Sequence, residues 1–277
     1  MLDVICTAAL SHLNVNNDSM IPAHIHTEIL KRIKAAEQEH NVKVLYAIES
    51  GSRAWGFASP NSDFDVRFIY AHPSDWYLTI DVEDKRDVIE YPIVDEIDIN
   101  GWDIRKALKL LWRSNPGIVE WLQSPIVYVD DGIFAPAARA LLPDVYSPAK
   151  GIYHYRHMAK NNYREHFKGE TVVIKKYFYI LRALLSCKWI EQKNLPAPIE
   201  FHKVCELIAD DTSLKNEIAA LLERKTSSQE KEIAAPIPAL NRFIEDTLAY
   251  YEEHKPVEVD TKGDIEQLNK LFKRYMV

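Results

Sequence analysis

The sequence predicts an α+β fold, in which a mixed sheet with flanking helices is followed by an all-α region. Before about residue 145, short apolar runs typical of strands are interleaved with amphipathic segments, whereas only helical periodicity follows. This segregation indicates two domains, because a chain of 277 residues is long enough to build two hydrophobic cores. We expect a sheet-containing domain over 21–145 and a helical domain over 146–277, with residues 1–20 as a flexible extension.

The first domain is expected to open with a helix and to continue with strands. "MIPAHIHTEILKRIKAAEQEH" places Ile25, Ile29 and Ile33 on one helical face. From Trp102 onward the strand pattern gives way to a helical period, which stops near Pro116. The expected elements are helices over 22–40, 101–115 and 116–124, strands at 42–48, 65–70, 86–94 and 96–100, and an extended segment at 124–131.

The second half of the chain predicts helices only. They are expected over 149–167, 170–193, 200–208, 212–224, 236–254 and 263–275. Between two of them, "ERKTSSQEKEIAAP" at 223–236 is charged and contains serines, which is typical of a solvated loop.

Composition favours a globular protein of the cytoplasm. Hydrophobic residues make up 47% of the chain and charged residues 27%, which is ordinary for globular proteins. No apolar run reaches the roughly 18 residues that a membrane span needs, and the N-terminus does not resemble a signal peptide. Cys6, Cys187 and Cys205 are odd in number and lack metal-ligand spacing, as expected of reduced thiols.

The charge of the chain is unevenly distributed. A formal net charge of −7 argues against an obligate, sequence-independent nucleic-acid binder. Residues 151–193, however, hold nine Lys or Arg against three Glu, a local balance of +6, and Arg156, Lys160 and Arg164 follow helical spacings within them. Two interpretations stay open for this stretch, a solvated helix surface and a face that meets phosphates.

A glycine turn follows the first expected strand, in "AIESGSRAWGFASPNSDFDVRFIY" at 47–70. Gly51 allows a sharp turn, because glycine adopts backbone angles that other residues resist. The backbone N–H groups and the Ser52 hydroxyl then form a small concavity suited to anions, with Arg53 as an added charge or as a solvent-facing residue. If "RAWGF" begins a helix, its N-terminus adds a favourable dipole for phosphate.

Two aspartates begin the next apolar run. Asp63 and Asp65 are two positions apart, and on a strand this spacing directs both carboxylates to one face. Carboxylates that converge repel unless a cation lies between them, and Mg²⁺ takes such oxygen ligands together with substrate phosphates. The alternative is ordinary turn chemistry after "SPNS". The order strand, Gly-Ser turn, Asp-x-Asp, strand favours a phosphate cradle beside a metal site, the equipment of nucleotidyl transfer.

These residues resemble the motif of the DNA polymerase β-like nucleotidyltransferase superfamily, Gly-Ser followed about a dozen residues later by Asp-x-Asp. More narrowly, "SGSRAWGFASPNSDFDVRFIY", "IDINGWDIRKALKLLWRSNPGIVEWLQSPIVY" and "IKKYFYILRALLSCKWI" are similar to the RNA-repair-associated bacterial branch, over about 40 to 205. The resemblance implies a polymerase-β-like catalytic domain and an NTP substrate such as ATP. It also implies two Mg²⁺ ions, with Mn²⁺ able to substitute, held by Asp63, Asp65 and a third carboxylate on a neighbouring strand.

The third carboxylate is expected to be Asp98. The candidates in and just before the next expected strand and helix are Asp95, Glu96, Asp98 and Asp103. In "EIDIN", Asp98 faces away from its two isoleucine neighbours, whereas Asp103 is already explained by the start of a helix. Glu96 shares the face of Asp98 and is its rival. By the resemblance, Asp98 binds the catalytic metal and assists deprotonation of the nucleophile.

The expected helix over 170–193 carries a second group of candidates. Lys175, Tyr179 and Arg182 lie on one face, at i, i+4 and i+7. They are interpreted either as core residues with snorkelling cations or as contacts to the triphosphate or the acceptor, as the resemblance implies.

The function predicted from the sequence is metal-dependent transfer of an NMP from an NTP to a hydroxyl, with release of pyrophosphate. The acceptor is left open between an RNA 3′ end, a protein hydroxyl and a small molecule, and no membrane partner is expected. The alternative is a non-catalytic nucleotide-binding protein of the same fold, with a regulatory or antitoxin-like role. Intact Gly51, Ser52, Asp63 and Asp65 weigh against that alternative.

Overall fold

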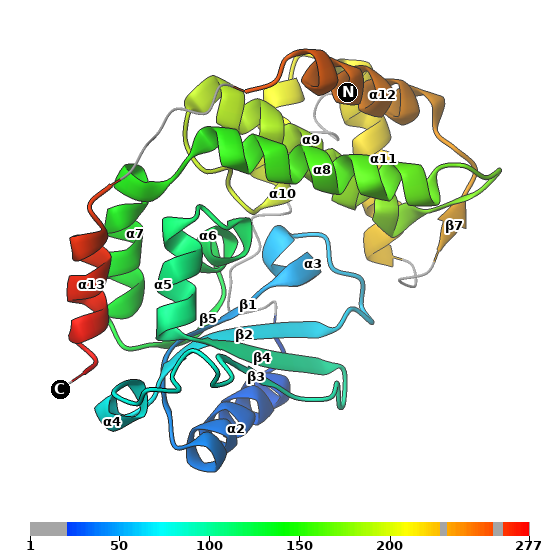
Figure 1. Cartoon of the computed structure of the whole chain (residues 1–277). Helices are drawn as coiled ribbons and strands as arrows, with labels where there is room; N and C mark the ends of the chain where they lie inside the picture. Colours follow the sequence, from blue (N-terminus) through cyan, green and yellow to red (C-terminus); the bar gives the residue numbers. More distant parts are fainter. Residues whose placement is uncertain (1–20, 228–231, 257–262, 277) are drawn as a thin grey trace. The chain divides into compact units, whose positions relative to one another are not determined.

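The computed structural model describes residues 21–227, 232–256 and 263–276, which form two compact units (Figure 1). The sheet unit comprises the described parts of 21–54, 63–146 and 263–276, and the helical unit those of 55–62 and 147–256. The α+β prediction is confirmed, since one unit holds a five-stranded mixed sheet with helices on it. The extension predicted at 1–20 lies outside the described residues.

The sheet has the strand order β3-β4-β2-β1-β5. Its strands are β1 (Lys43–Glu49), β2 (Phe64–Ala71), β3 (Val88–Glu90), β4 (Ile97–Asp103) and β5 (Val127–Asp130). Strands β2 and β4 run parallel, and the other neighbours are antiparallel. Burial alternates along β4 and the first half of β2, so each presents one fully packed face and one more polar face there.

Helices cover both faces of this sheet (Figure 1). The helices of this unit are α2 (Ala23–His40), α3 (Gly51–Trp55), α4 (Ser74–Tyr77), α5 (Ile104–Trp112), α6 (Pro116–Gln123), α7 (Phe134–Val145) and α13 (Ile265–Lys273). Helix α2 packs on one face, where Ile29 and Ile33 join Val66 and Phe68 in one buried cluster. Helices α5, α6, α7 and α13 form a second cluster with the opposite face.

The sheet unit differs from the sequence prediction at several element boundaries. The helix expected over 101–115 begins only at Ile104, because β4 continues to Asp103, whose carboxylate caps the helix by accepting from the Arg105 N–H at 2.7 Å. The strand expected at 86–94 is limited to three residues, and α7 was not among the expected elements.

The predicted division into 21–145 and 146–277 differs from the two units in two segments. Residues 55–62 belong to the helical unit, and α13 belongs to the sheet unit. The reason for the second difference is the apolar face of α13, whose Leu268 and Leu271 are buried in the cluster that α5 and α7 share.

The helical unit is organised around one buried helix, α9. Its elements are α8 (Pro148–His166), α9 (Ile174–Lys193), α10 (Phe201–Cys205), the 3₁₀ turn η2 (Glu206–Ile208), α11 (Thr212–Ser227) and α12 (Pro238–Glu253), with a two-stranded ribbon of β6 (Val172–Val173) and β7 (Ile233–Ala234). This ribbon was missed by the helix-only prediction. None of the described helices has the length and apolar character to cross a bilayer.

A buried lysine joins the 55–62 segment to α11. Lys225 is 1% exposed, and its Nζ bonds the Ser59 hydroxyl, which in turn donates to the Lys225 carbonyl oxygen at 2.9 Å. Phe57 of the same segment stacks on Phe178 of α9. The prediction of a solvated loop over 223–236 is therefore wrong at its start, because α11 continues to Ser227. Residues 228–231 lie outside the described residues.

Close packing at Gly101 gives a stability prediction. Gly101 of β4 is the register partner of Phe68 of β2, and a methyl group at position 101 would lie 2.3 Å from the buried Phe68 ring. Gly101→Ala should therefore lower the free energy of unfolding by about 1–3 kcal/mol, through overpacking. Urea titration measures this loss. Gly169→Ala is the control, since the nearest atom to its added methyl lies 3.7 Å away, and equal stabilities of the two variants would contradict the prediction.

Candidate active site

Two of the predicted carboxylates lie side by side on neighbouring strands. Asp65 of β2 and Asp98 of β4 are register partners in a parallel pair, so their side chains share one face of the sheet. The Arg67 guanidinium bridges them, with its Nη2 at 3.1 Å from Asp65 Oδ1 and 2.7 Å from Asp98 Oδ2. All three side chains are partly buried, and Arg67 offsets the repulsion between the two carboxylates.

The Gly-Ser turn lies directly against Asp65. The Ser50 N–H donates to the Asp65 carbonyl oxygen at 2.8 Å, and Gly51 has a φ of +60°. A methyl group at Gly51 would fall 1.9 Å from Asp65 Oδ2, so the backbone approaches this carboxylate as closely as glycine allows. Turn and strand are thus joined as the sequence predicted, and Asp65 offers one oxygen to Arg67 and the other toward the turn.

Ser52 and Arg53 follow in α3, a helix of only five residues. So short a helix adds little dipole to a phosphate site. Ser52 is 9% exposed, and Arg53 packs over the Phe64 ring with its Nε donating to the Asp63 carbonyl oxygen at 3.2 Å. Arg53 therefore contacts the start of β2, near the carboxylates.

Asp63 is exposed and directly precedes β2, which begins at Phe64, so the expected placement of both aspartates on one strand holds for Asp65 alone. Among the rivals of Asp98, Asp95 and Glu96 are exposed in a turn before β4, both with positive φ. Asp103 ends β4 as the cap of α5. Of the four candidates considered, only Asp98 lies on a strand directly beside Asp65.

The sequence analysis missed Glu49, the last residue of β1. Glu49 is 0% exposed, accepts the Asp65 N–H at 2.9 Å and accepts the Tyr128 hydroxyl at 2.7 Å. Burial raises the pKa of Glu49 to about 7. Its carboxylate fixes the backbone of Asp65 from inside the sheet. A polar residue ending a buried strand directly before the Gly-Ser turn was the available sequence signal.

The Tyr128–Glu49 bond gives a second stability prediction. Tyr128→Phe leaves one oxygen of a buried carboxylate without its donor, and should lower the free energy of unfolding by about 1–3 kcal/mol. Denaturant unfolding measures the loss. Tyr91→Phe is the matched control, because the hydroxyl of Tyr91 bonds the exposed carboxylate of Glu39. A loss no larger than that of the control would show that the buried bond contributes nothing.

The donor set at this cluster is of the kind that Mg²⁺ takes. Asp65 and Asp98 offer hard carboxylate oxygens on one face of the sheet, and Asp63 precedes the strand that carries Asp65. Within the described residues, no group of three or more His, Cys, Asp or Glu side chains is arranged to enclose an ion, and Arg67 bonds both Asp65 and Asp98. Their carboxylate oxygens are donors of the kind that fits Mg²⁺, and Arg67 is the cation that pairs with Asp65 and Asp98 here.

The candidates on α9 belong to the helical unit. Arg182 is 3% exposed and lies 4.0 Å from the centre of the Trp55 ring, and Tyr179 packs edge-on against the same indole. The Lys175 ammonium lies 5.6 Å from the Tyr179 ring. This burial agrees with the interpretation of Arg182 as a core residue rather than a contact to the triphosphate, because aromatic rings cover its guanidinium.

The basic stretch at 151–193 is partly neutralised. Arg156 and Lys160 of α8 both pair with Glu252 of α12, and Arg156 also donates to the Tyr251 carbonyl oxygen. For these two residues the structure favours a paired helix surface over a face open to phosphates.

The Gly51–Asp65–Asp98 arrangement agrees with the class to which the family match assigns the chain, the DNA polymerase β-like proteins. The chain belongs to the RlaP family, described as the RNA repair pathway DNA polymerase beta family, whose model matches residues 25–274. It is 42% identical over 245 residues to the "Uncharacterized protein YcgL" of Bacillus subtilis (strain 168), an alignment that covers 88% of this chain and 94% of that protein. The resemblance that the motifs indicated is thereby confirmed at the level of the family.

Proposed function

We propose that the protein is a metal-dependent nucleotidyltransferase, which transfers an NMP from an NTP to a hydroxyl acceptor and releases pyrophosphate. The observation that carries the proposal is Asp65 in register with Asp98, with Gly51 packed against the Asp65 carboxylate. Membership of a polymerase β family supports it. In this proposal the sheet unit is the polymerase-β-like catalytic domain, and the helical unit is the all-α domain that accompanies it.

Asp63, Asp65 and Asp98 would hold two Mg²⁺ ions, with Mn²⁺ able to substitute. When bound, these ions neutralise triphosphate charge and lower the pKa of the attacking hydroxyl. The backbone of Gly51 and the Ser52 hydroxyl bind the phosphates, with Arg53 adjacent.

Asp98 assists removal of the proton from the acceptor hydroxyl, whose oxygen bonds the α-phosphorus. The bond from that phosphorus to the bridging oxygen breaks, and pyrophosphate leaves. From the helical unit, Lys175 and Tyr179 are the proposed contacts to the triphosphate or the acceptor.

The test is incubation of the pure protein with each α-³²P-labelled NTP, Mg²⁺ or Mn²⁺, and a pool of RNA, followed by denaturing gels. Label on RNA identifies an RNA acceptor, and label on protein identifies a protein hydroxyl. Label on neither, with no small-molecule product on thin-layer plates, would overturn the transferase and support a non-catalytic nucleotide-binding role.

Matched carboxylate variants test the assignment of Asp98. Asp98→Asn should reduce label transfer by about a hundredfold or more, because a charged group at the reaction centre is lost. Glu96→Gln, in the turn two residues earlier, should retain nearly full transfer. If Glu96→Gln were the more impaired variant, the third carboxylate would be Glu96.

A further inference from the structure

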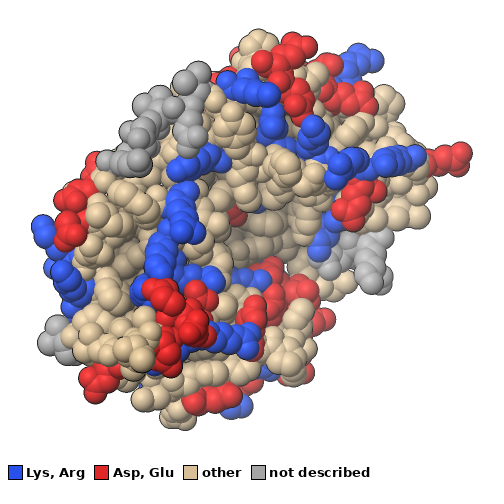
Figure 2. Space-filling model, in the orientation of Figure 1, with Lys and Arg blue, Asp and Glu red and all other residues tan. Residues whose placement is uncertain are grey.

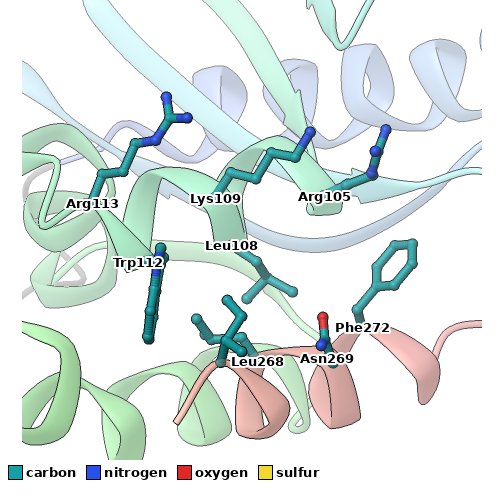
Figure 3. A pocket seen from close by; sticks show the side chains of 9 residues that line it. Arg105, Leu108, Lys109, Trp112, Arg113, Leu268, Asn269 and Phe272 are labelled. Carbon is teal, nitrogen blue, oxygen red and sulfur yellow. The ribbon is translucent and has the colours of Figure 1, made fainter. Parts of the chain in front are cut away.

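A hollow of about 370 Å³ lies between α5 and α13 of the sheet unit, on elements that the proposed reaction does not use (Figure 3). Its apolar part is formed by Leu108 and Trp112 of α5 and by Leu268 and Phe272 of α13. The fold holds it in place, because Leu268 and neighbouring Leu271 are buried in the core that α5 shares. The helices that form the groove are therefore anchored in the core of the unit.

A row of cations borders the groove. Arg105, Lys109 and Arg113, the residue that caps α5, follow one another at i, i+4 and i+8, so their backbone positions are spaced by about 6 Å along the helix axis. Figure 3 shows the three side chains extending from the same side of α5, and Figure 2 shows Lys and Arg side chains in a column over this helix. In a chain of net charge −7, such a row is a local reversal of sign.

Glu83 is the acidic residue that pairs with this row, and it neutralises the row only weakly. Glu83 pairs with Arg105 and lies 3.4 Å from Lys109, and its side chain is 67% exposed. Exposed ion pairs contribute little and exchange readily for another anion. Arg113 is exposed and has no salt bridge within the described residues. The row therefore presents positive charge to a ligand.

An aromatic ring lines the same groove as these cations. Trp112 is partly exposed and lines the groove, and no other aromatic ring of the described residues packs on it. By contrast, Trp102 stacks on Trp121 at 3.8 Å, and Trp76 stacks on His72 at 4.0 Å. An indole next to a line of cations offers a surface on which a base can stack while phosphates meet the charges.

We propose that this groove binds a single strand of nucleic acid, with successive phosphates on Arg113, Lys109 and Arg105 and a base against Trp112. About one cation per helical turn, in a regular row, suits the regular repeat of a phosphate backbone. An acidic peptide would use the charges but not the stacking surface, which is why a nucleic-acid strand is favoured. Binding here does not require nucleotidyl transfer, although a strand held on the sheet unit would be a natural acceptor for it.

Fluorescence anisotropy of a 5′-labelled twelve-residue oligouridylate, without NTP or divalent metal, tests this proposal. Lys109→Ala/Arg113→Ala should weaken binding at least tenfold, and should flatten the slope of log affinity against log salt by about 1.4 for two lost contacts. The control is Lys31→Ala/Lys34→Ala, which removes two exposed charges from α2 and should leave binding unchanged. An oligothymidylate of equal length shows whether RNA is preferred.

Trp112 is tested separately from the charges. Trp112→Leu should weaken binding about five- to tenfold with an unchanged salt slope, and Trp112→Phe should restore most of it, since phenylalanine also stacks. Equal weakening in the α2 control, competition by polyglutamate as strong as by RNA, or no binding by the wild-type chain would overturn the proposal. Strand binding that persists in a protein without transferase activity would contradict only the proposed function.

Discussion

Asp65→Asn is expected to impair nucleotidyl transfer severely while the protein stays folded. The carboxylate is bonded on one oxygen by Arg67 and faces Gly51 with the other, so it is the member of the cluster that joins the turn to the sheet. Asparagine has nearly the same shape but no charge, and it binds hard cations far more weakly than a carboxylate. We expect a loss of about a hundred- to a thousandfold in kcat, the size typical of losing one electrostatic group at a reaction centre.

The measurement is label transfer from α-³²P NTP, together with the melting temperature of each variant. Asp95→Asn is the matched control, since its side chain is 75% exposed and its pair with Arg32 contributes little to stability. Asp65→Asn should melt close to the wild type and transfer almost nothing, and Asp95→Asn should transfer normally. An active Asp65→Asn protein would remove Asp65 from the proposed chemistry.

The sequence was sufficient to predict the strand, turn and strand around the site. Local rules explain why: Gly51 indicates a turn by its lack of a side chain, and alternation along "EIDIN" separates Asp98 from its isoleucine neighbours. That Asp98 lies beside Asp65 depends on the pairing of β2 with β4, which the structure shows. The family resemblance supplied the expectation of a neighbouring carboxylate, and strand alternation selected the residue.

Other features depend on contacts between residues far apart in the chain. Arg67 follows Asp65 on the same strand face, but its bridge to Asp98 appears only when the two strands pair. Glu49 follows the strand predicted at 42–48 and was not among the candidates, and its partner Tyr128 lies 79 residues away. Lys225 belongs to a charged stretch that predicts a solvated loop, but in the structure it is buried and its ammonium bonds Ser59. Whether a charged residue is buried depends on its partners in the tertiary structure, and the hydrophobic periodicity of the sequence contains no information about those partners.

Gly51→Ala is the second change for which we expect a large effect. The added methyl would fall 1.9 Å from Asp65 Oδ2 and 2.7 Å from its Cγ, far inside van der Waals contact. Either the Asp65 side chain rotates away or the turn moves, and both changes separate the phosphate cradle from the carboxylate. We expect transfer to fall at least a hundredfold, and the free energy of unfolding to fall by about 1–3 kcal/mol from overpacking.

Gly132→Ala separates this contact from backbone strain. Gly132 also has a positive φ, +73° against +60° at Gly51, but an added methyl there meets nothing within 4 Å. It therefore shares the cost of placing an L-residue in the left-handed region, about 1 kcal/mol, without the collision. Transfer and urea unfolding measured on both variants give the difference. If Gly51→Ala retained activity at the level of Gly132→Ala, close approach of the turn to Asp65 would not be needed for the reaction, and the phosphate cradle would have to lie elsewhere.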